Sequence, residues 1–245
     1  MKKVLIIGAT SAIAKHCAQL WARRGNELYL VARNEEHLKA IASDLKAKGA
    51  RQTHIHSMDL NEIDNHFAML NKAEVILGDI DIVLIAYGTL PNQKMCEQNV
   101  IKTIAEIQTN ALSIISLLTH IANRFEIKRS GTIAVISSVA GDRGRNSNYV
   151  YGSSKAMITS FSSGLRQRLH KANVAVVTIK PGFVNTPMTV NFKKGLLWVK
   201  PEFVSEKIVK AIDKRKDEIY IPSFWWLIMT AIKIIPESLF KRINI

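Results

Sequence analysis

Cysteine is scarce in this chain, which has only Cys17 and Cys96 among its 245 residues. Two cysteines cannot form the disulfide framework of a small secreted protein, and this favours a reducing compartment. Long apolar runs are also missing, since no stretch reaches the roughly 18 apolar residues that cross a bilayer. The apolar run at residues 4–7 is too short for a secretory signal and is interrupted by Gly8. We therefore expect a cytoplasmic protein, with any membrane contact peripheral and at the inner face.

Acidic residues are outnumbered, because the chain has 20 Asp and Glu against 34 Lys and Arg, a formal charge of +14. Such an excess indicates an anionic partner, which can be a nucleic acid, a phosphorylated metabolite or an anionic lipid. No nucleic-acid-binding motif is recognisable, so we expect no nucleic acid. His54 and His56 share one face of a predicted strand without a further ligand, so we expect no metal site.

Short apolar runs rich in β-branched residues alternate with segments of helical length. The predicted strands are 3–7, 27–31, 53–57, 81–86, 132–137, 174–179 and 218–221, and the predicted helices are 12–24, 34–48, 61–73, 97–126 and 151–171. This alternation predicts an α/β fold with a parallel sheet covered on both faces. Right-handed crossovers make it a doubly wound, Rossmann-type sheet of about seven strands. We expect a single domain over residues 1–221 that includes the substrate site, followed by an amphipathic tail at 222–245.

The turn after the first predicted strand is poor in glycine. In "GATSAIA" (8–14) only Gly8 remains of the three glycines that usually form a dinucleotide-binding turn, and Ala12 and Ala14 take the other places. A pyrophosphate would lie here, at the N-terminus of the following helix. A simple strand-to-helix turn has the same residues, so the turn alone does not decide. Arg33 follows the second strand, where NAD-preferring sites place a carboxylate, and its guanidinium can bind a 2′-phosphate. This favours NADP, while without a nucleotide site Arg33 is a solvated surface residue.

Several polar or turn-forming residues follow the ends of predicted strands. The carboxyl ends of such strands line the ligand crevice of a doubly wound sheet. Asp59 could bond an adenine and Gly88 would let the backbone approach a cofactor, but a helix cap and a turn glycine explain the same two residues. Pro181 and Gly182 end the sixth strand, where they would turn the chain over a bound nicotinamide.

The stretch "YVYGSSKAM" (149–157) begins a predicted helix and places Tyr151 and Lys155 one turn apart on the same face. Tyrosine needs a fall in pKa from about 10 to about 7, or roughly 4 kcal/mol, to exchange protons at neutral pH. An ammonium about 5 Å away supplies about 3 kcal/mol at an effective dielectric constant near 20. The pair therefore predicts that Lys155 lowers the pKa of Tyr151. A surface tyrosine packed on a lysine stem is the simpler alternative.

Asn110 lies inside the predicted helical segment 97–126. Asparagine is unfavourable in the middle of a helix, so we expect a kink or a water-bridging role at this position.

These motifs occur in the order found in the short-chain dehydrogenase/reductase family, which the chain resembles from residue 3 to about residue 190. The specific part is the spacing of Ser138, Tyr151 thirteen residues later and Lys155 four residues after that. The segment at the end of the fourth strand, which would form the cofactor-side wall of the site, departs from the family pattern. Here Ile-Ala-Tyr-Gly (85–88) replaces the usual Asn-Asn-Ala-Gly.

The resemblance implies NADPH-dependent interconversion of a ketone and an alcohol, typically by a homo-oligomer. Tyr151 would protonate the carbonyl oxygen, Lys155 would lower the pKa of Tyr151 and hold the nicotinamide ribose, and Ser138 would polarise the carbonyl. Asn110 would anchor a water that relays protons to Lys155. Such acid catalysis contributes roughly 10²–10⁴-fold. The cofactor-binding residues implied, besides Tyr151 and Lys155, are Gly8, Thr10, Ser11, Ile13, Arg33, Asp59, Leu60, Gly88, Pro181, Gly182, Val184 and Thr186.

The tail is unusually apolar, with thirteen mostly apolar residues between Pro222 and Pro236. Thirteen residues are too few to span a bilayer. The residues Phe224, Trp225 and Trp226 with the flanking Lys233, Lys241 and Arg242 suit a helix that lies in a membrane interface. Packing on the core or on a second subunit explains the tail equally well.

Two stretches, "SSVAGDRGRNSNYVYGSSKA" and "IPESLFKRINI", resemble reductases of decaprenylphosphoryl-2-keto-ribose. That resemblance implies a lipid-linked, phosphorylated keto substrate such as a polyprenyl-phosphate 2-keto-pentose, and a partner oxidase. Arg143 and Arg145 could bind the substrate phosphate, or be solvated loop charges. A reductase of another lipid-like ketone, such as a 3-oxoacyl thioester or keto-sphingoid base, remains open. A non-enzymatic NADP-binding redox sensor is the alternative of another class, against which the intact Ser138, Tyr151 and Lys155 argue.

Overall fold

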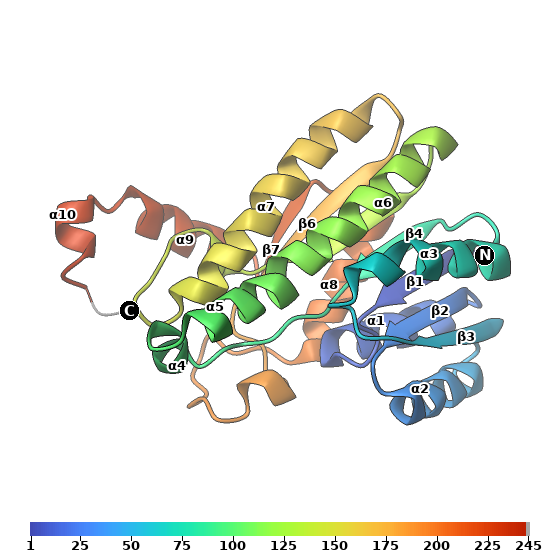
Figure 1. Ribbon diagram of the computed structural model, residues 1–245, viewed down its shortest axis with the longest axis horizontal. Helices are drawn as coiled ribbons and strands as arrows, with labels where there is room; N and C mark the ends of the chain where they lie inside the picture. Colours follow the sequence, from blue (N-terminus) through green and yellow to red (C-terminus); the bar gives the residue numbers. More distant parts are fainter. Residues whose placement is uncertain (244–245) are drawn as a thin grey trace.

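The computed structural model describes residues 1–243, which form one seven-stranded parallel sheet with helices on both faces (Figure 1). The strand order is β3-β2-β1-β4-β5-β6-β7. The strands are β1 Lys3–Ile7, β2 Glu27–Ala32, β3 Gln52–Ser57, β4 Ile82–Ile85, β5 Thr132–Ile136, β6 Ala175–Pro181 and β7 Glu218–Ile221. The predicted fold class is therefore confirmed, and all seven predicted strands are present with their ends shifted by at most two residues.

Helices α1 (Ala12–Ala22), α2 (Glu35–Ala47) and α8 (Pro201–Asp213) cover one face of the sheet. Helices α3 (His66–Leu77), α6 (Ser113–Lys128) and α7 (Tyr149–His170) cover the other. The central strand β1 shows how the sequence builds both layers. Successive side chains of a strand point to opposite faces, so Val4 and Ile6 belong to the first core and Leu5 and Ile7 to the second. Burial on both faces is why these strands are continuously apolar.

The segment predicted as one helix over 97–126 is interrupted. It begins at the last residue of α4 (Gln93–Glu97) and forms α5 (Val100–Ile107), a π-helical turn at Gln108–Leu112, and most of α6. Asn110 explains the π-turn, because its buried Nδ2 donates to the carbonyl of Glu106 at 3.1 Å and to Thr89 Oγ1 at 2.9 Å. Its Oδ1 accepts from the Thr89 N–H at 2.9 Å. The expected kink is thus a local widening of the helix, a feature often found at functional sites.

The C-terminal tail follows β7 as two helices, α9 (Phe224–Ile234) and α10 (Glu237–Phe240), which extend from the body of the molecule at the left of Figure 1. One side of α9 is packed on the core, because Trp225 and Met229 are buried together with Val139. Within the described residues, no helix is both long and apolar enough to cross a membrane. The division into 1–221 and 222–245 stays a prediction, and the last two residues of the tail lie outside the described part.

Arg143 fastens the tail to the loop that follows β5, and this corrects one expectation from the sequence. Its guanidinium lies 3.6 Å from the centre of the Phe240 ring and donates to the carbonyls of Ile232 and Ile235 at 2.5 and 2.6 Å. It also pairs with Glu237 at 2.8 Å. Arg143 was a candidate for binding substrate phosphate, but both of its terminal nitrogens are bonded to α9, to the segment that leads into α10, or to the first residue of α10.

Candidate active site

A cavity of about 690 Å³ lies at the carboxyl ends of the parallel strands. It extends on both sides of the junction between β1 and β4, where the strand order reverses and ligands of such sheets bind. The cavity is lined by all the predicted cofactor residues: Gly8, Thr10, Ser11, Ile13, Arg33, Asp59, Leu60, Gly88, Pro181, Gly182, Val184 and Thr186. Ser138, Tyr151 and Lys155 line it as well.

Ser138 and Tyr151 meet although different elements carry them. Ser138 follows β5, and its side chain lies close enough to the hydroxyl of the half-buried Tyr151, in the first turn of α7, to lower the pKa of that hydroxyl. The Ser138 Oγ also accepts the Ala140 N–H at 3.1 Å, which caps the short 3₁₀ turn Val139–Gly141 and fixes the serine. Two hydroxyl groups therefore face the same part of the cavity.

Lys155 lies one turn further along α7. The whole residue, side chain included, is only 3% exposed. Its Nζ donates to the Ile136 carbonyl at 3.2 Å and lies 5.6 Å from the centre of the Tyr151 ring. The described part of the chain shows no carboxylate paired with this amine. Burial without a counter-charge lowers the pKa of Lys155 from 10.5 to about 8.

The pKa of Tyr151 is the reverse of what the sequence predicted. Burial raises it from 10.0 to about 12, and the neighbouring Ser138 side chain lowers it only in part. The sequence argument counted the attraction of the ammonium and left out the desolvation of both groups, which here is the larger effect. In this structure Tyr151 keeps its proton at neutral pH and is available as a proton donor.

Gly8 and Gly88 shape the cavity wall. Gly8 has φ +85°, and a Cβ there would lie 2.6 Å from Tyr87 Cβ. A Cβ on Gly88 would lie 2.7 Å from Asn110 Oδ1. Both positions therefore require glycine. Asn110 itself does not line the cavity, and its amide holds the Gly88–Thr89 wall in place, so its water-anchoring role stays a prediction.

Gly182 also makes room for the tail, besides its predicted place in a turn over the nicotinamide. A Cβ at this position would lie 1.9 Å from the indole nitrogen of Trp225, so the missing side chain makes room for the tail. The tail tryptophan thus packs directly behind the Pro181–Gly182 turn, which itself lines the cavity.

The residues present fit a dinucleotide cofactor. The start of α1 offers backbone N–H groups that the helix leaves unpaired, and no acidic residue lies in its first turn. Arg33 is exposed at the end of β2 and its carbonyl is fixed by Ser57 Oγ at 2.8 Å. Asp59 lies beside it along the same cavity. Arg33 and Asp59 suit the adenosine end of a dinucleotide. The buried Lys155 suits its nicotinamide end.

The comparisons with known proteins agree with this geometry. Residues 2–196 match the family described as short chain dehydrogenase. The chain belongs to the short-chain dehydrogenase family. An uncharacterised oxidoreductase of Mycobacterium tuberculosis is 33% identical over 98% of this chain and 96% of its own length. Another from Streptomyces coelicolor is 30% identical over 99% and 96%. A 3-oxoacyl-[acyl-carrier-protein] reductase of Chlamydia muridarum is 29% identical over 81% of each chain.

As a short-chain dehydrogenase, the protein is an NAD(P)-dependent oxidoreductase. A nicotinamide cofactor, when bound, would supply the hydride chemistry. The chain itself provides a protonated Tyr151 hydroxyl, a Ser138 hydroxyl beside it, and the buried Lys155 amine with its pKa lowered to about 8. The roles of Asn110, Ser138, Tyr151 and Lys155 in turnover remain predictions that rest on this placement.

Two groups of functional residues have no signal in the sequence. Phe183, Met188, Phe192 and Trp198 form an apolar wall of the cavity, and a loop without a recognisable motif carries most of them. Tyr87 stands where the family pattern has an alanine, in the cavity wall after β4, and its hydroxyl lies 2.6 Å from Ser113 Oγ.

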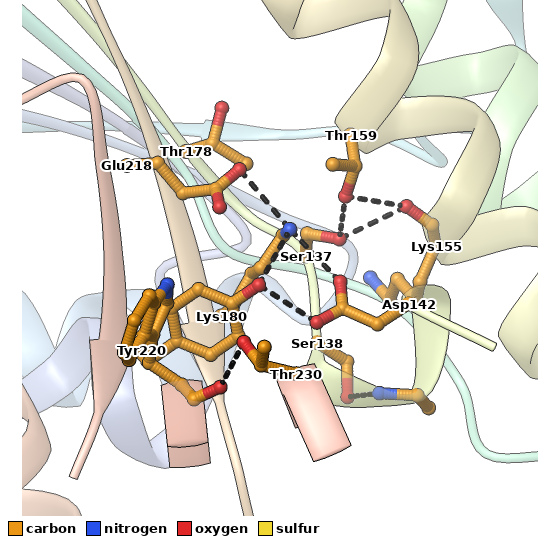
Figure 2. A network of polar contacts seen from close by, with 12 residues as sticks. Ser137, Ser138, Asp142, Lys155, Thr159, Thr178, Lys180, Glu218, Tyr220 and Thr230 are labelled. Atoms are coloured by element: carbon orange, nitrogen blue, oxygen red, sulfur yellow. Dashed lines mark hydrogen bonds and ion pairs between the residues drawn. The ribbon is translucent and has the colours of Figure 1, made fainter. Parts of the chain in front are cut away.

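The second group is a buried ionic network behind the Ser138 loop, which Figure 2 shows. Lys180 Nζ lies 2.9 Å from Asp142 and 3.1 Å from Glu218, and the side chains of Lys180 and Asp142 are 5% and 3% exposed. The Tyr220 hydroxyl donates to Asp142 at 2.7 Å. Burial alone would lower the pKa of Lys180, but the bonds to Asp142 and Glu218 raise it overall. The network ties the loop after β5 to β6 and β7, and so positions Ser138.

We predict that Asp142→Asn lowers the free energy of unfolding by roughly 3 kcal/mol, because it removes one partner of a buried ion pair. Urea unfolding of the purified variant measures this. The matched control is Asp213→Asn, whose carboxylate pairs with Arg24 at the surface and is 45% exposed. That change should cost at most about 1 kcal/mol. Equal stabilities for the two variants would show that the network does not hold the loop.

We predict that Lys155→Met raises stability at pH 7 and loses this advantage at high pH. The lysine has a pKa of about 8 when folded and 10.5 in the reference state, so the unfolded chain binds more protons between these values. The contribution of Lys155 to the free energy of unfolding of the wild-type protein therefore rises with pH through that range. The variant gains on the order of 3 kcal/mol at pH 7 and almost nothing near pH 10.5.

Urea unfolding at the two pH values measures this gain, with Lys171→Met as the control at an exposed position at the end of the same helix. The control should change little at either pH. A Lys155→Met variant no more stable than wild type at pH 7 would contradict the account of a penalised buried ammonium.

Proposed function

We propose that this protein is an NADPH-dependent reductase that converts the ketone of a lipid-linked, phosphorylated substrate, such as a polyprenyl-phosphate 2-keto-pentose, into a secondary alcohol. The observation that carries the proposal is the continuity of one cavity. It runs from Arg33, past Ser138, Tyr151 and Lys155, to Arg145 and an apolar wall. Each part of the proposed reaction thus has residues of suitable chemistry in the same space.

The proton arrangement supports reduction. A carbonyl oxygen beside Ser138 and Tyr151 would accept hydrogen bonds from both hydroxyls, and Tyr151 would transfer its proton to that oxygen as hydride reaches the carbon. The Tyr151 hydroxyl is protonated at neutral pH because burial holds its pKa at about 12. The buried Lys155 ammonium behind the ring would stabilise the phenolate left after the transfer.

Arg145 supports a phosphorylated substrate. It lines the cavity, and its buried Nε has no hydrogen-bond partner among the described residues. Burial lowers the pKa of this guanidinium, and Asp142 opposes the effect. A buried donor without a partner is costly, and an anionic group of the substrate would satisfy it. Of the two arginines considered from the sequence, Arg145 remains a candidate for phosphate binding.

The apolar wall supports a lipid chain. Phe183 and Trp198 stack with ring centres 5.3 Å apart, and Phe192 lies 6.5 Å from Trp198. Phe192 and Met188 are also about half exposed at the surface, so this wall opens outward. A substrate with a phosphate near Arg145 and an apolar chain along this wall uses both features. In such a pathway a partner oxidase would form the ketone from a secondary alcohol.

A second candidate substrate is a 3-oxoacyl thioester, because a relative named as a 3-oxoacyl-[acyl-carrier-protein] reductase is 29% identical over 81% of this chain. The apolar wall would hold its acyl chain equally well. The unpartnered Arg145 Nε favours the phosphorylated substrate. A homo-oligomeric state is expected from the family and stays a prediction.

We predict that Tyr151→Phe reduces ketone turnover by roughly 10²–10⁴-fold, because the proton donor is lost. NADPH oxidation is measured with a polyprenyl-phosphate 2-keto-pentose and, separately, with a 3-oxoacyl thioester, while NADPH binding by fluorescence should be unchanged. Tyr149→Phe, two residues earlier and 42% exposed, is the control. Turnover with the thioester alone would support the second candidate, and wild-type protein that reduces neither substrate would overturn both.

We predict that Arg33→Ala weakens NADPH binding by roughly 10- to 150-fold and leaves NADH binding nearly unchanged, because a charged hydrogen bond to the 2′-phosphate contributes about 1.5–3 kcal/mol. Titration calorimetry with both nucleotides measures this difference. Arg51→Ala, an exposed arginine at the start of β3, is the control. Equal losses for the two nucleotides would rule out recognition of the phosphate by Arg33.

A further inference from the structure

The outer face of α9 is apolar although it faces solvent. Trp225 and Met229 point inward, and the residues left outside include Phe224, Trp226, Leu227 and Ile234, which are 38%, 54%, 64% and 74% exposed. The only charged residue of this helix is Lys233. A surface helix normally presents its polar side to water. A face of this kind marks a place where another apolar surface binds.

The apolar surface continues on both sides of α9. Leu239 in α10 is 55% exposed, and the loop at 188–197 exposes Met188, Val190, Phe192, Leu196 and Leu197. Ring contacts connect the loop to the helix, because Phe183 stacks on Trp198 and meets Trp225 edge-on at 5.2 Å. We call the outer face of α9 and α10 together with this loop the tail–loop surface.

The charges in these two segments have one sign. Residues 187–200 and 222–243 contain six basic residues, which are Lys193, Lys194, Lys200, Lys233, Lys241 and Arg242. The only acidic residue in the same two segments is Glu237, which pairs with Arg143. A second copy of this chain would bring the same six positive charges to the contact, and the charges would repel. An anionic lipid surface offers both the opposite charge and an apolar layer.

The geometry excludes insertion across the bilayer. Helix α9 has 11 residues, or about 16 Å at 1.5 Å per residue, against an apolar thickness of about 30 Å. A helix too short to cross, with an exposed apolar face and a lysine near its end, lies in the plane of the interface.

We propose that the tail–loop surface binds the surface of an anionic lipid bilayer. Its exposed Phe192 and Met188 also line the catalytic cavity, so binding would place the cavity mouth at the lipid. This inference goes beyond the proposed reaction and does not depend on the identity of the ketone, because it rests on exposure and charge alone. A lipid-linked substrate would then reach the cavity without leaving the membrane.

The test is co-sedimentation of the full chain with vesicles of phosphatidylcholine alone and of phosphatidylcholine mixed with phosphatidylglycerol. The variant is Trp226→Glu with Leu227→Glu, which places two charges on the outer face of α9. The matched control is Val75→Glu with Ile127→Glu, because these residues are each 85% exposed and lie on α3 and α6. Light scattering of each protein without vesicles reports its oligomeric state, and reduction of a water-soluble ketone reports that the site is intact.

We expect binding to the anionic vesicles that weakens with salt, a loss of at least about tenfold in the α9 variant, and no loss in the control. The α9 variant should keep the wild-type oligomeric state and activity on the soluble ketone. Failure of wild type to bind anionic vesicles would overturn the proposal, as would equal losses in the two variants. A wild-type dimer that dissociates only in the α9 variant would overturn it as well, and would assign the surface to a second copy. Inactivity of wild type on every ketone with intact vesicle binding would refute the proposed function alone.

Discussion

The burial of the Lys155 amine is the constraint on which the active site depends. The amine lies in the interior behind the Tyr151 ring, with the Ile136 carbonyl at 3.2 Å and no carboxylate beside it in the described part of the chain. A charge held in this way destabilises the fold, and this cost explains its low pKa. Residues that reduce stability at a cavity are expected where they serve the reaction. The pKa of Lys155 is lowered and the pKa of Tyr151 is raised. Tyr151 therefore stays a neutral phenol that can donate its proton.

The other parts of the structure hold this pair and shape the space in front of it. The π-turn at Asn110 places the Gly88–Thr89 wall, and the network of Asp142, Lys180 and Tyr220 fixes the loop that carries Ser138. The C-terminal tail is continuous with the same site, because Trp225 occupies the space that a side chain at Gly182 would need. Helix α9 therefore has an inner face that supports the catalytic cavity and an outer face that is apolar and exposed. The tail–loop surface and the site are parts of one structure.

Much of the fold followed from the sequence because its determinants are local. Continuous apolar strands such as 3–7 and 82–85 predict a sheet buried on both sides, and Tyr151 and Lys155 share a helix face by spacing alone. The failures have nonlocal causes. Desolvation depends on how many atoms surround Tyr151 in the folded state, and no spacing shows this. Arg143 contacts the tail, which lies about 90 residues later in the chain. Lys180 on β6 pairs with Asp142, which lies before α7 in the loop that follows β5. The aromatic wall comes from a loop that has neither periodicity nor a motif.

The most direct measurement of the central claim is a titration of the Lys155 amine by NMR, with the side-chain nitrogen labelled and the signal assigned by comparison with Lys155→Met. The account predicts a pKa near 8, well below the ordinary value of 10.5, and a Tyr151 hydroxyl that stays protonated throughout that titration. A Lys155 pKa at or above 10.5 would contradict it, because the amine would then be paired or solvated and could not be the buried, uncompensated charge described above.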